Sequence, residues 1–393
     1  MEYPSVLHRR HNDYPLAPER LTISESMLSP FQLEFPANQK KTSTKLAPNL
    51  RDKKNYVLHY RNLKFYLEQG MILRKIHKVL TFKQSPWLKT YIDYNTRMRA
   101  MSSSGFAKDF YKLMNNSVFG KTQENLRNRV NVEVLTNREK ALKRVCKPSH
   151  KRSFTIREDL VIMQTAVTQL ELNKPLYVGF SVLELSKLHM YKFHYSKMIP
   201  RYNDNLSLCF TDTDSLLYEI GTNDIYSDMR ENMDDYDFSE YPSDHPNYDA
   251  TNKKIIGKFK DELNSLPLEE FIGLRPKCYS LLFRGEVKNN TLKHMDVSEK
   301  QTAKGTKSSV KDAFLRHHHY KDVLSNLSTV RVKQNVFKSR HHDIGTCHQH
   351  KVALTAFDTK RWIENDGIHT LAYGHCNTCN ENSIDWDEDI DVL

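Results

Sequence analysis

The stretch LSLCFTDTDSLLYEI, residues 206–220, decides the fold. Its two apolar runs, 206–210 and 215–220, predict a pair of buried strands, and the polar residues between them predict the tight turn of a hairpin. Asp212 and Asp214 fall in that turn. Carboxylates held this close repel each other unless they share a cation, and hard oxygen ligands of this kind suit Mg²⁺. The alternative is a structural turn that uses Asp and Thr because both residue types favour turns.

Helix signals dominate the chain before this hairpin. Residues 56–69 predict one helix, with Leu63 and Leu67 on one face and Gly70 as its end signal. The other expected elements are helices over residues 86–99 and 106–119, a strand over 130–135, and a long helix after Pro175. That helix carries an apolar stripe, most of which is expected to be core: Val182, Leu185, Leu188, Tyr191 and Tyr195.

The helix predicted over 106–119 carries a second chemical signal in the string KLMNNSVFGKT. Spacings of four, seven and eight positions place a cation, an amide, a ring and a small residue on one face: Lys112, Asn116, Phe119 and Gly120. Such a face suits a nucleoside triphosphate. Another face is expected to pack inward: Phe106, Phe110, Leu113 and Ser117. The alternative is an amphipathic helix whose solvent face happens to contain Lys and Asn.

Composition bounds the class of protein. The chain has 393 residues, 38% of them hydrophobic, which is enough for one large or two to three modest globular units and argues against wholesale disorder. No stretch approaches the ~18 apolar residues of a membrane span, so we expect neither secretion nor membrane insertion. The six cysteines are scattered, which favours a reducing, intracellular compartment.

Charge is unevenly distributed along the chain. The net charge is +11, and residues 37–160 hold repeated Lys and Arg clusters interleaved with aromatic residues. This combination suits a groove for a polyanion, because cations neutralise phosphates and aromatic faces stack on bases. The alternative is a solvated basic surface. Residues 224–249 are acidic instead, with nine acids and one Arg, and are expected to be repelled by nucleic acid.

Three strings together resemble a known family. KLMNNSVFG matches a KxxxNSxYG motif, FTDTDS matches a YxDTDS motif, and RPKCYSLLF carries Lys277 and Tyr279 as a KxY motif; Phe119 and Phe210 replace the usual tyrosines. In this order the motifs are similar to those of protein-primed family B DNA polymerases. The flanking strings look most like the polymerases of Maverick/Polinton transposons and related viruses, and the resemblance covers about residues 3–375.

The resemblance implies roles for individual residues in DNA-directed DNA synthesis. Asp214 would be the main metal ligand, and Asp212 would contribute to the second Mg²⁺ of a two-metal site. The nucleotide contacts implied are Lys112 and Arg99 to the triphosphate, and Asn116 and Phe119 to the sugar and base. Lys277 and Tyr279 would grip the primer terminus. The implied partners are a DNA primer-template, a dNTP and a possible protein primer, with no membrane.

The resemblance also implies an α+β, right-hand fold with an antiparallel palm sheet, helical fingers and a C-terminal thumb, without an exonuclease domain. The expected division places part of the palm and an insertion region in residues 1–84, fingers in 85–125, palm in 126–290, thumb in 291–375 and an acidic tail in 376–393.

One family motif is not found whole. A DxxSLYP motif, whose Asp supplies another metal-bridging carboxylate, would precede the KxxxNSxYG helix. Residues 237–242, DFSEYP, are a partial lookalike, but they follow Asp214. Tyr3 and Pro4 could be the last two residues of the motif, which would place its Asp before Met1. We therefore expect an incomplete metal site, and the alternative function is an inert mobile-element remnant that at most binds nucleic acid.

The remaining His and Cys residues give weaker signals. Cys347, His348 and His350, together with Cys376 and Cys379, could form a zinc site. The run of residues 317–319, three histidines, is expected to be solvated rather than a ligand set. Cys209 and Cys278 flank the predicted catalytic strands and are expected to be small core residues.

Overall fold

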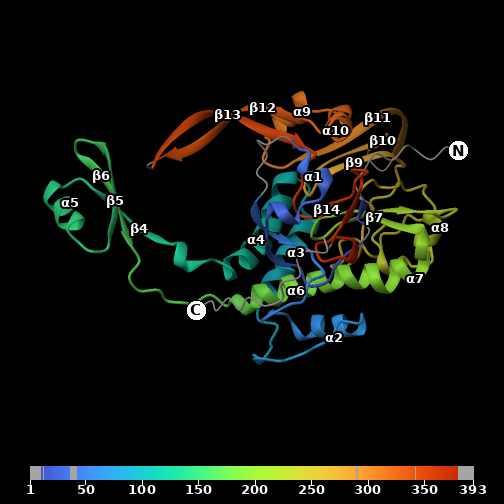
Figure 1. The fold of residues 1–393 in the computed structure, drawn as a ribbon, viewed down its shortest axis with the longest axis horizontal. Helices are drawn as coiled ribbons and strands as arrows, with labels where there is room; N and C mark the ends of the chain where they lie inside the picture. Colours follow the sequence, from blue (N-terminus) through green and yellow to red (C-terminus); the bar gives the residue numbers. More distant parts are fainter. Residues whose placement is uncertain (1–9, 12, 36–41, 289–290, 341, 379–393) are drawn as a thin grey trace.

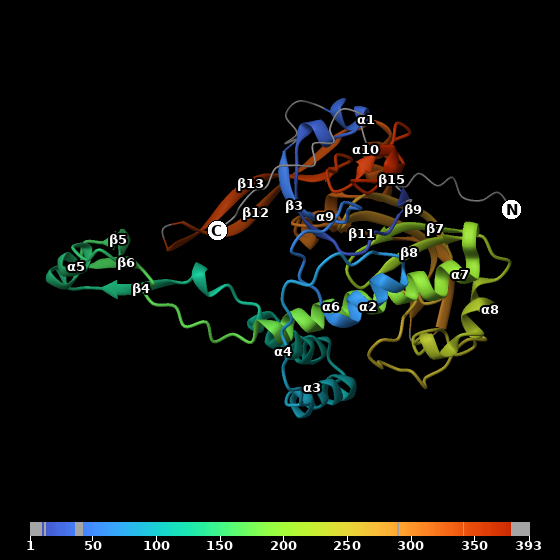
Figure 2. The same cartoon turned by 60° about the horizontal axis from the view of Figure 1, so that its bottom comes forward.

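The computed structural model describes residues 10–11, 13–35, 42–288, 291–340 and 342–378. Helices and antiparallel sheets occur together along the chain, which confirms the expected mixture of α and β structure. Figures 1 and 2 show a main body from which a small lobe, residues 130–166, and a long hairpin, residues 329–355, project. Among the described residues no helix is long and apolar enough to cross a bilayer. The palm, fingers and thumb layout and its boundaries stay predictions.

A five-stranded sheet carries the predicted hairpin. β7 (Leu206–Thr211) pairs antiparallel with β8 (Leu216–Ile220), as the sequence predicts. The strand order is β14-β15-β1-β7-β8, where the other members are β1 (Arg10–His11), β14 (Trp362–Ile363) and β15 (His369–Leu371). β1 lies antiparallel to β7 and parallel to β15. Segments far apart in the sequence therefore meet beside the hairpin.

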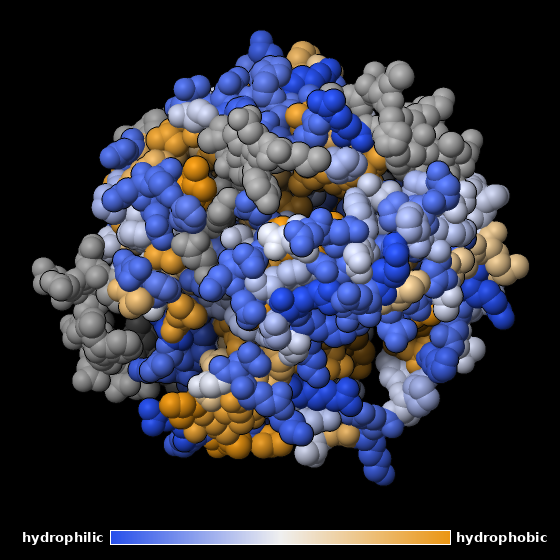
Figure 3. All heavy atoms as spheres, turned by 90° about the vertical axis from the view of Figure 1, so that its right-hand side faces the viewer, coloured by the Kyte–Doolittle hydropathy of each residue, from blue (hydrophilic) through white to orange (hydrophobic). Residues whose placement is uncertain are grey.

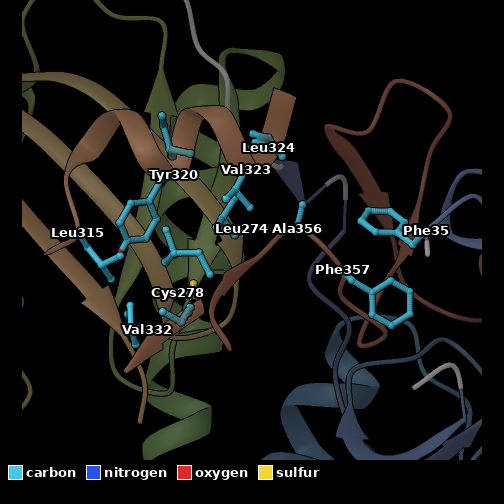
Figure 4. Packing of buried hydrophobic residues seen from close by; sticks show 14 of the residues in the cluster. Phe35, Leu274, Cys278, Leu315, Tyr320, Val323, Leu324, Val332, Ala356 and Phe357 are labelled. Carbon is cyan, nitrogen blue, oxygen red and sulfur yellow. Dashed lines mark hydrogen bonds between the residues drawn. The ribbon is translucent and has the colours of Figure 1, made fainter. Parts of the chain in front are cut away.

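A three-stranded antiparallel sheet forms the largest core. Its order is β11-β10-β9, from β9 (Leu268–Arg275), β10 (Cys278–Lys288) and β11 (Thr291–Ala303). α10 (His317–Ser325) packs on this sheet and buries Tyr320 and Val323 completely. Figure 4 shows both side chains facing Leu274 and Cys278. Cys278 is 2% exposed and Cys209 is 4% exposed, which confirms both as core residues.

Two antiparallel helices form a hairpin in the middle of the chain. They are α3 (Lys89–Met101) and α4 (Gly105–Thr122), each within a few residues of the predicted bounds. The Tyr91 hydroxyl donates a hydrogen bond to the Met114 carbonyl at 3.3 Å and joins the two helices. A β-carbon added to Gly179 would clash with the Thr122 hydroxyl. The end of α4 and the start of the next helix are therefore packed closely at this glycine.

That next helix, α6 (Leu176–Phe193), is the long helix predicted after Pro175. Leu188 and Tyr191 are buried, and they pack with Phe65 of α2 (Tyr60–Glu68) in one hydrophobic cluster. Val182 is 48% exposed. The prediction that most of the stripe is core is therefore confirmed, with Leu185 and Tyr195 packed against the same cluster and Val182 as the exposed exception.

The lobe is a small sheet with one helix. Its elements are β4 (Val130–Leu135), α5 (Arg138–Val145), β5 (His150–Arg157) and β6 (Leu160–Ala166). The long hairpin consists of β12 (Thr329–Arg340) and β13 (Asp343–Thr355). At the hairpin tip, His342 Nε2 lies 2.8 Å from Gln164 Nε2 of β6, and its ring lies 5.2 Å from that of Phe154 of β5. The two projections therefore touch.

The other helices and strands are short: α1 (Pro30–Leu33), β2 (Glu19–Ile23), β3 (Ser43–Ala47), α7 (Ile199–Tyr202), α8 (Ile225–Arg230) and α9 (Ser308–Phe314).

Figure 3 shows the side of the molecule on which α7 and α8 lie, covered mainly by hydrophilic residues with smaller hydrophobic patches. Part of the acidic stretch lies here. Arg201 pairs with Asp228 at 2.8 Å and with Glu231 at 2.7 Å, so this stretch is partly neutralised by the protein itself.

Candidate functional site

The turn between β7 and β8 holds Asp212 and Asp214 in a fixed arrangement. The Asp212 amide donates to the Ser215 carbonyl at 3.1 Å, and the Asp214 amide donates to the Asp212 carbonyl at 2.7 Å. Thr213 between them has a φ of 62°. A β-branched residue rarely adopts this left-handed conformation, so the turn stores local backbone strain. Such strain persists only where the surrounding strands over-determine the backbone, and here it orients two carboxylates.

The KxY turn meets this carboxylate turn. Lys277 lies between β9 and β10 with a φ of 63°, and its Nζ lies 3.0 Å from Asp212 Oδ1. The Lys277 side chain is 42% exposed and that of Asp212 25% exposed, so water screens the pair and it adds at most about 1 kcal/mol to stability. The ion pair matters mainly for the charge balance of the turn, because the Lys277 ammonium partly offsets the repulsion between Asp212 and Asp214.

Tyr279 follows two positions later and packs behind the same turn. Its ring centroid lies 4.9 Å from that of Phe210 and 6.1 Å from that of Phe271. Phe210, the residue in place of the family tyrosine, is 8% exposed and packs with Cys209 and Leu281 in one cluster. This cluster joins the five-stranded sheet to the three-stranded sheet, so the two motifs are held by a shared core.

Asp214 differs from Asp212 because it is exposed and no other described side chain hydrogen-bonds or pairs with its carboxylate. Within the described ranges there is no group of three or more His, Cys, Asp or Glu side chains that could hold a metal ion. The turn therefore offers two hard oxygen ligands where a clamp for two Mg²⁺ needs more. The described residues do not fit a complete two-metal site, and we assign no reaction step to a metal.

Two other carboxylates that could have completed such a site have partners elsewhere. Asp13 pairs with Arg361 and also accepts a hydrogen bond from the Ala372 amide at 2.8 Å. Asp237, in the DFSEYP lookalike, accepts from the Ser239 amide at 3.0 Å and from the Lys254 amide at 2.9 Å. Both carboxylates hold loops in place, and the DFSEYP string is structural.

The predicted nucleotide face lies along α4. The Ser104 hydroxyl caps this helix by accepting from the Ala107 amide at 3.1 Å. Lys112 and Asn116 are exposed, Phe119 is half-buried, and Arg99 is exposed on the adjacent α3. Across the described residues, no hydrogen bond or ion pair joins this face to the Asp212–Asp214 turn. The structure thus brings together the DTD and KxY motifs, and it places the α4 motif on a separate exposed surface.

The prediction that a second face of α4 packs inward is wrong. Phe106 is 83% exposed, Leu113 58% and Phe110 44%, and Ser117 is exposed as well. The physical reason is that α4 packs mainly against α3 and α6, which leaves these side chains in solvent. The rings of Phe106 and Phe110 instead lie stacked on each other, with centroids 6.5 Å apart.

The His and Cys signals resolve into different roles. His317, expected to be solvated, is buried: its Nδ1 lies 2.9 Å from Ser280 Oγ and its Nε2 lies 3.0 Å from Glu270 Oε2. Cys347 and His348 are neighbours on β13, so strand alternation points them to opposite faces. Cys379 lies outside the described residues. The part of the chain that is described holds no zinc ligand cluster.

Sequence reasoning missed cations that lie close to the predicted nucleotide face. Lys108 stands one helical turn before Lys112, and this spacing of four positions could have identified it. Burial and then the positive charges of Lys108, Lys253 and Arg99 lower the pKa of Lys254. Nothing in the sequence could have indicated this interaction, because 145 positions separate Lys108 from Lys253.

The fold is thus an α+β arrangement of antiparallel sheets with two adjacent carboxylates at the tip of one hairpin. Among solved structures, it is similar to phi29 DNA polymerase complexed with primer-template DNA, with a TM-score of 0.40 and 15% identity, and to the same polymerase complexed with single-stranded DNA, at 0.38 and 13%. Each match covers 68% of this chain and 38% of the polymerase chain, so this chain spans well under two thirds of that protein. No family model and no curated protein matches the chain.

Proposed function

We propose that the chain binds primer-template DNA and serves in nucleotidyl transfer from a dNTP to a primer hydroxyl, as part of a family B DNA polymerase. One observation carries the proposal: Lys277 Nζ lies 3.0 Å from Asp212 Oδ1. The two residues belong to motifs more than 60 positions apart, and each was assigned to the reaction centre from sequence alone. Their meeting at two strained turns, at Thr213 and Lys277, supports the proposal, because backbone strain clusters at functional sites.

In this proposal the residues divide the work between two surfaces. The Asp212–Asp214 turn would lie at the primer end, where its two carboxylates would supply part of the ligand set that Mg²⁺ needs. Lys277 would exchange its contact with Asp212 for a primer phosphate. The α4 face, with Lys112 and Asn116, would receive the nucleotide. A charged contact of this kind contributes about 1.5–3 kcal/mol when both partners are desolvated.

A second candidate is a remnant of a mobile element that binds nucleic acid without catalysis. The observation that favours it is the pair of carboxylates at the turn, which has no third ligand among the described residues. Losing part of a metal clamp removes several kcal/mol of charge stabilisation from the transition state. Each ~1.4 kcal/mol is tenfold in rate, so such a chain would be slower by orders of magnitude.

DNA binding is tested by fluorescence anisotropy with a labelled primer-template at 50 and 200 mM salt. If about four phosphates are contacted, the affinity should fall by about 100-fold over this range, because counterions are released from the DNA. A flat salt response would contradict the polyanion groove and with it both candidates.

Catalysis is tested by extension of a labelled primer with dNTPs and Mg²⁺. The first candidate predicts measurable extension that Asp214→Asn abolishes, with Asp93→Asn, an exposed carboxylate on α3, as the matched control. Salt-dependent DNA binding without extension, at every Mg²⁺ concentration tried, would favour the remnant.

A further inference from the structure

The chain between α2 and α3 exposes a run of apolar side chains. Residues 71–83, MILRKIHKVLTFK, form neither a helix nor a strand, and Figure 1 shows this part of the chain as a loop beside α2 at the edge of the molecule. We call it the apolar-basic segment. Six of its large apolar side chains are 43–74% exposed: Ile72, Leu73, Ile76, Val79, Leu80 and Phe82. Contiguous exposed apolar side chains of a soluble protein usually mark an interaction site.

The backbone of the apolar-basic segment is available for pairing. The Met71 amide donates a hydrogen bond to the Tyr66 carbonyl of α2 at 3.0 Å. Beyond it, no amide of residues 72–85 donates to another backbone group within the described chain. The Phe82 ring lies 5.3 Å from that of Tyr177 in the first turn of α6, so the far end of the segment also touches the main body. A stretch with free backbone groups is a template for an added strand.

The segment is also strongly basic. It contains Arg74, Lys75, Lys78 and Lys83 and no acid. These four side chains are exposed, and none of them pairs with an acid among the residues that the structure describes. A partner for this surface therefore needs apolar side chains, negative charge and a backbone that can pair.

The acidic tail of the same chain has this composition. Residues 384–392, IDWDEDIDV, lie outside the described residues, and their sequence alternates between apolar and acidic positions. In a strand, alternation would place four aspartates on one face and four apolar residues on the other: Ile384, Trp386, Ile390 and Val392. Three of these are β-branched and one is aromatic, which are the residue types that favour strands.

The tail begins within reach of the segment. A path of direct contacts leads from the residues before the tail to the start of the segment: Ala372 N to Asp13 Oδ2 at 2.8 Å, the ring of the adjacent Tyr14 to that of Tyr191 at 5.1 Å, the Tyr191 ring to that of Tyr66 at 6.2 Å, and the Tyr66 carbonyl to the Met71 amide at 3.0 Å. An extended chain advances by about 3.3 Å per residue, so the residues after Thr378 can span about 50 Å.

We propose that residues 384–392 dock on the apolar-basic segment of the same chain as an added β-strand. The tail supplies the backbone partners, its apolar face covers Ile76 and Leu80, and its acids neutralise the cations. Glu388 is the one acid on the apolar face. In either strand direction it falls opposite Lys78 in the register that sets Trp386 and Ile390 beside Ile76 and Leu80.

The inference goes beyond the proposed function and does not depend on it. A docked tail covers a strand template that would otherwise be open to pairing with another chain. Its acids also occupy cations in the basic region, residues 37–160, before any polyanion binds.

Hydrogen–deuterium exchange of the full chain, read by mass spectrometry, tests the docking. The amides of residues 72–82 should exchange about tenfold more slowly than in an unstructured peptide, which corresponds to a tail that is docked about 90% of the time. Trp386→Ser/Ile390→Ser should abolish this protection, because it removes the apolar contacts and keeps the charge. The matched control is Phe337→Ser/Ile344→Ser, which removes two exposed apolar side chains from the long hairpin and should leave the protection unchanged.

A charge exchange tests the contact between the two strands. Lys78→Glu and Glu388→Lys should each lower the protection by about threefold or more, because like charges would then face each other. The two substitutions together should restore it. Lys140→Glu combined with Glu388→Lys is the control, and it should not restore protection because Lys140 lies on α5 of the lobe. Failure of the Lys78 and Glu388 exchange to restore protection would overturn the contact.

The remaining outcomes identify the occupant of the segment. Free exchange of residues 72–82 in the full chain overturns the proposal, as does protection that persists in Trp386→Ser/Ile390→Ser. Carbodiimide cross-linking of a mixture of ¹⁵N-labelled and unlabelled chains distinguishes one chain from two. Links from Glu388 to Lys78 within one isotope support docking in the same chain, and links between isotopes overturn it in favour of a second copy. Thermal unfolding of each variant checks that the fold is retained.

Discussion

The carboxylate turn and the helical hairpin are two halves of the proposed reaction centre, and they differ in where their partners are. At the turn, Asp212 has Lys277 as an ion-pair partner, and Tyr279 packs on Phe210. On α3 and α4, Arg99, Lys108 and Lys112 have no ion-pair partner among the residues described. At the turn, Asp212 is therefore neutralised by another part of the protein, whereas the cations of the helical face are not. Substitutions in a region with internal partners should lower stability, and substitutions on the helical face should affect binding alone.

The largest effect is expected at a buried pair that supports the sheet of the turn. Asp13→Ala would leave Arg361 buried without its counter-charge; the Arg361 side chain is 6% exposed. Breaking such a pair lowers the free energy of unfolding by about 3–5 kcal/mol. Denaturant titration measures the change. Asp93→Ala, which breaks an exposed pair with Lys89, is the control and should change stability by less than about 0.5 kcal/mol. Equal losses of stability in Asp13→Ala and Asp93→Ala would contradict the proposed difference between the carboxylate turn and the helical hairpin.

The second effect depends on pH. His194 lies between Tyr14 and Tyr218, and burial lowers its pKa to about 4. An unfolded histidine titrates near pH ~6.5. Between these values the unfolded chain gains a proton that the folded chain does not, so the stability contribution is present above pH ~6.5 and is lost as the pH falls.

At pH 4 this loss amounts to about 3 kcal/mol. His194→Gln should flatten the stability profile between pH 7 and 4 by that amount, measured by denaturant titration at each pH. His318→Gln, which removes an exposed ring, should leave the slope unchanged. If the stability of His194→Gln falls with pH as steeply as that of the parent chain, His194 does not control acid stability.

A smaller effect is expected for DNA capture at the turn. Lys277→Ala/Tyr279→Ala should weaken binding of a primed template by about tenfold and of plain duplex by about threefold or less, because the pair is proposed to contact the primer end. Lys300→Ala on β11 of the same sheet controls for loss of a positive charge. Competition anisotropy measures both ligands, and an equal loss for both would place Lys277 and Tyr279 outside primer recognition.

The smallest change in stability is expected on α4. Lys112→Ala should leave the free energy of unfolding within about 0.5 kcal/mol of the parent chain and reduce dNTP affinity several-fold. Lys121→Ala on the same helix, which breaks a surface pair with Glu124, is the control and should not change dNTP affinity. A large loss of stability in Lys112→Ala would mean that the α4 face has an internal structural role.

Local patterns predicted local structure well. The bounds of β4, 130–135, agree with the prediction, and the hairpin of β7 and β8 agrees to within one residue. These elements are set by alternation and turn residues that lie within the same short window. α2 begins four residues later than expected because His59 forms its N-cap, with Nδ1 accepting from the Arg61 amide at 3.3 Å.

Tertiary contacts were the part that sequence could not supply. Whether Phe106 faces a core or solvent depends on which helices pack beside α4. The sequence around Phe106 contains no information on those helices. His317 was assigned to solvent from the histidine run, but Ser280 and Glu270 contact it from the three-stranded sheet under α10. The carboxylate and KxY motifs were found from sequence, whereas the ion pair between Asp212 and Lys277 required the structure.

The position of β1 between β15 and β7 has a consequence for how the molecule folds. Asp13 and Ala372, joined by a hydrogen bond at 2.8 Å, are 359 positions apart in the chain. Closing so long a loop loses much chain entropy, and topologies with such high contact order fold slowly. β7, the strand before Asp212, pairs with β1, and β1 gains its other neighbour β15 only after nearly the whole described chain has been synthesised. The five-stranded sheet beside the proposed reaction centre is therefore expected to be among the last parts of the molecule to become ordered.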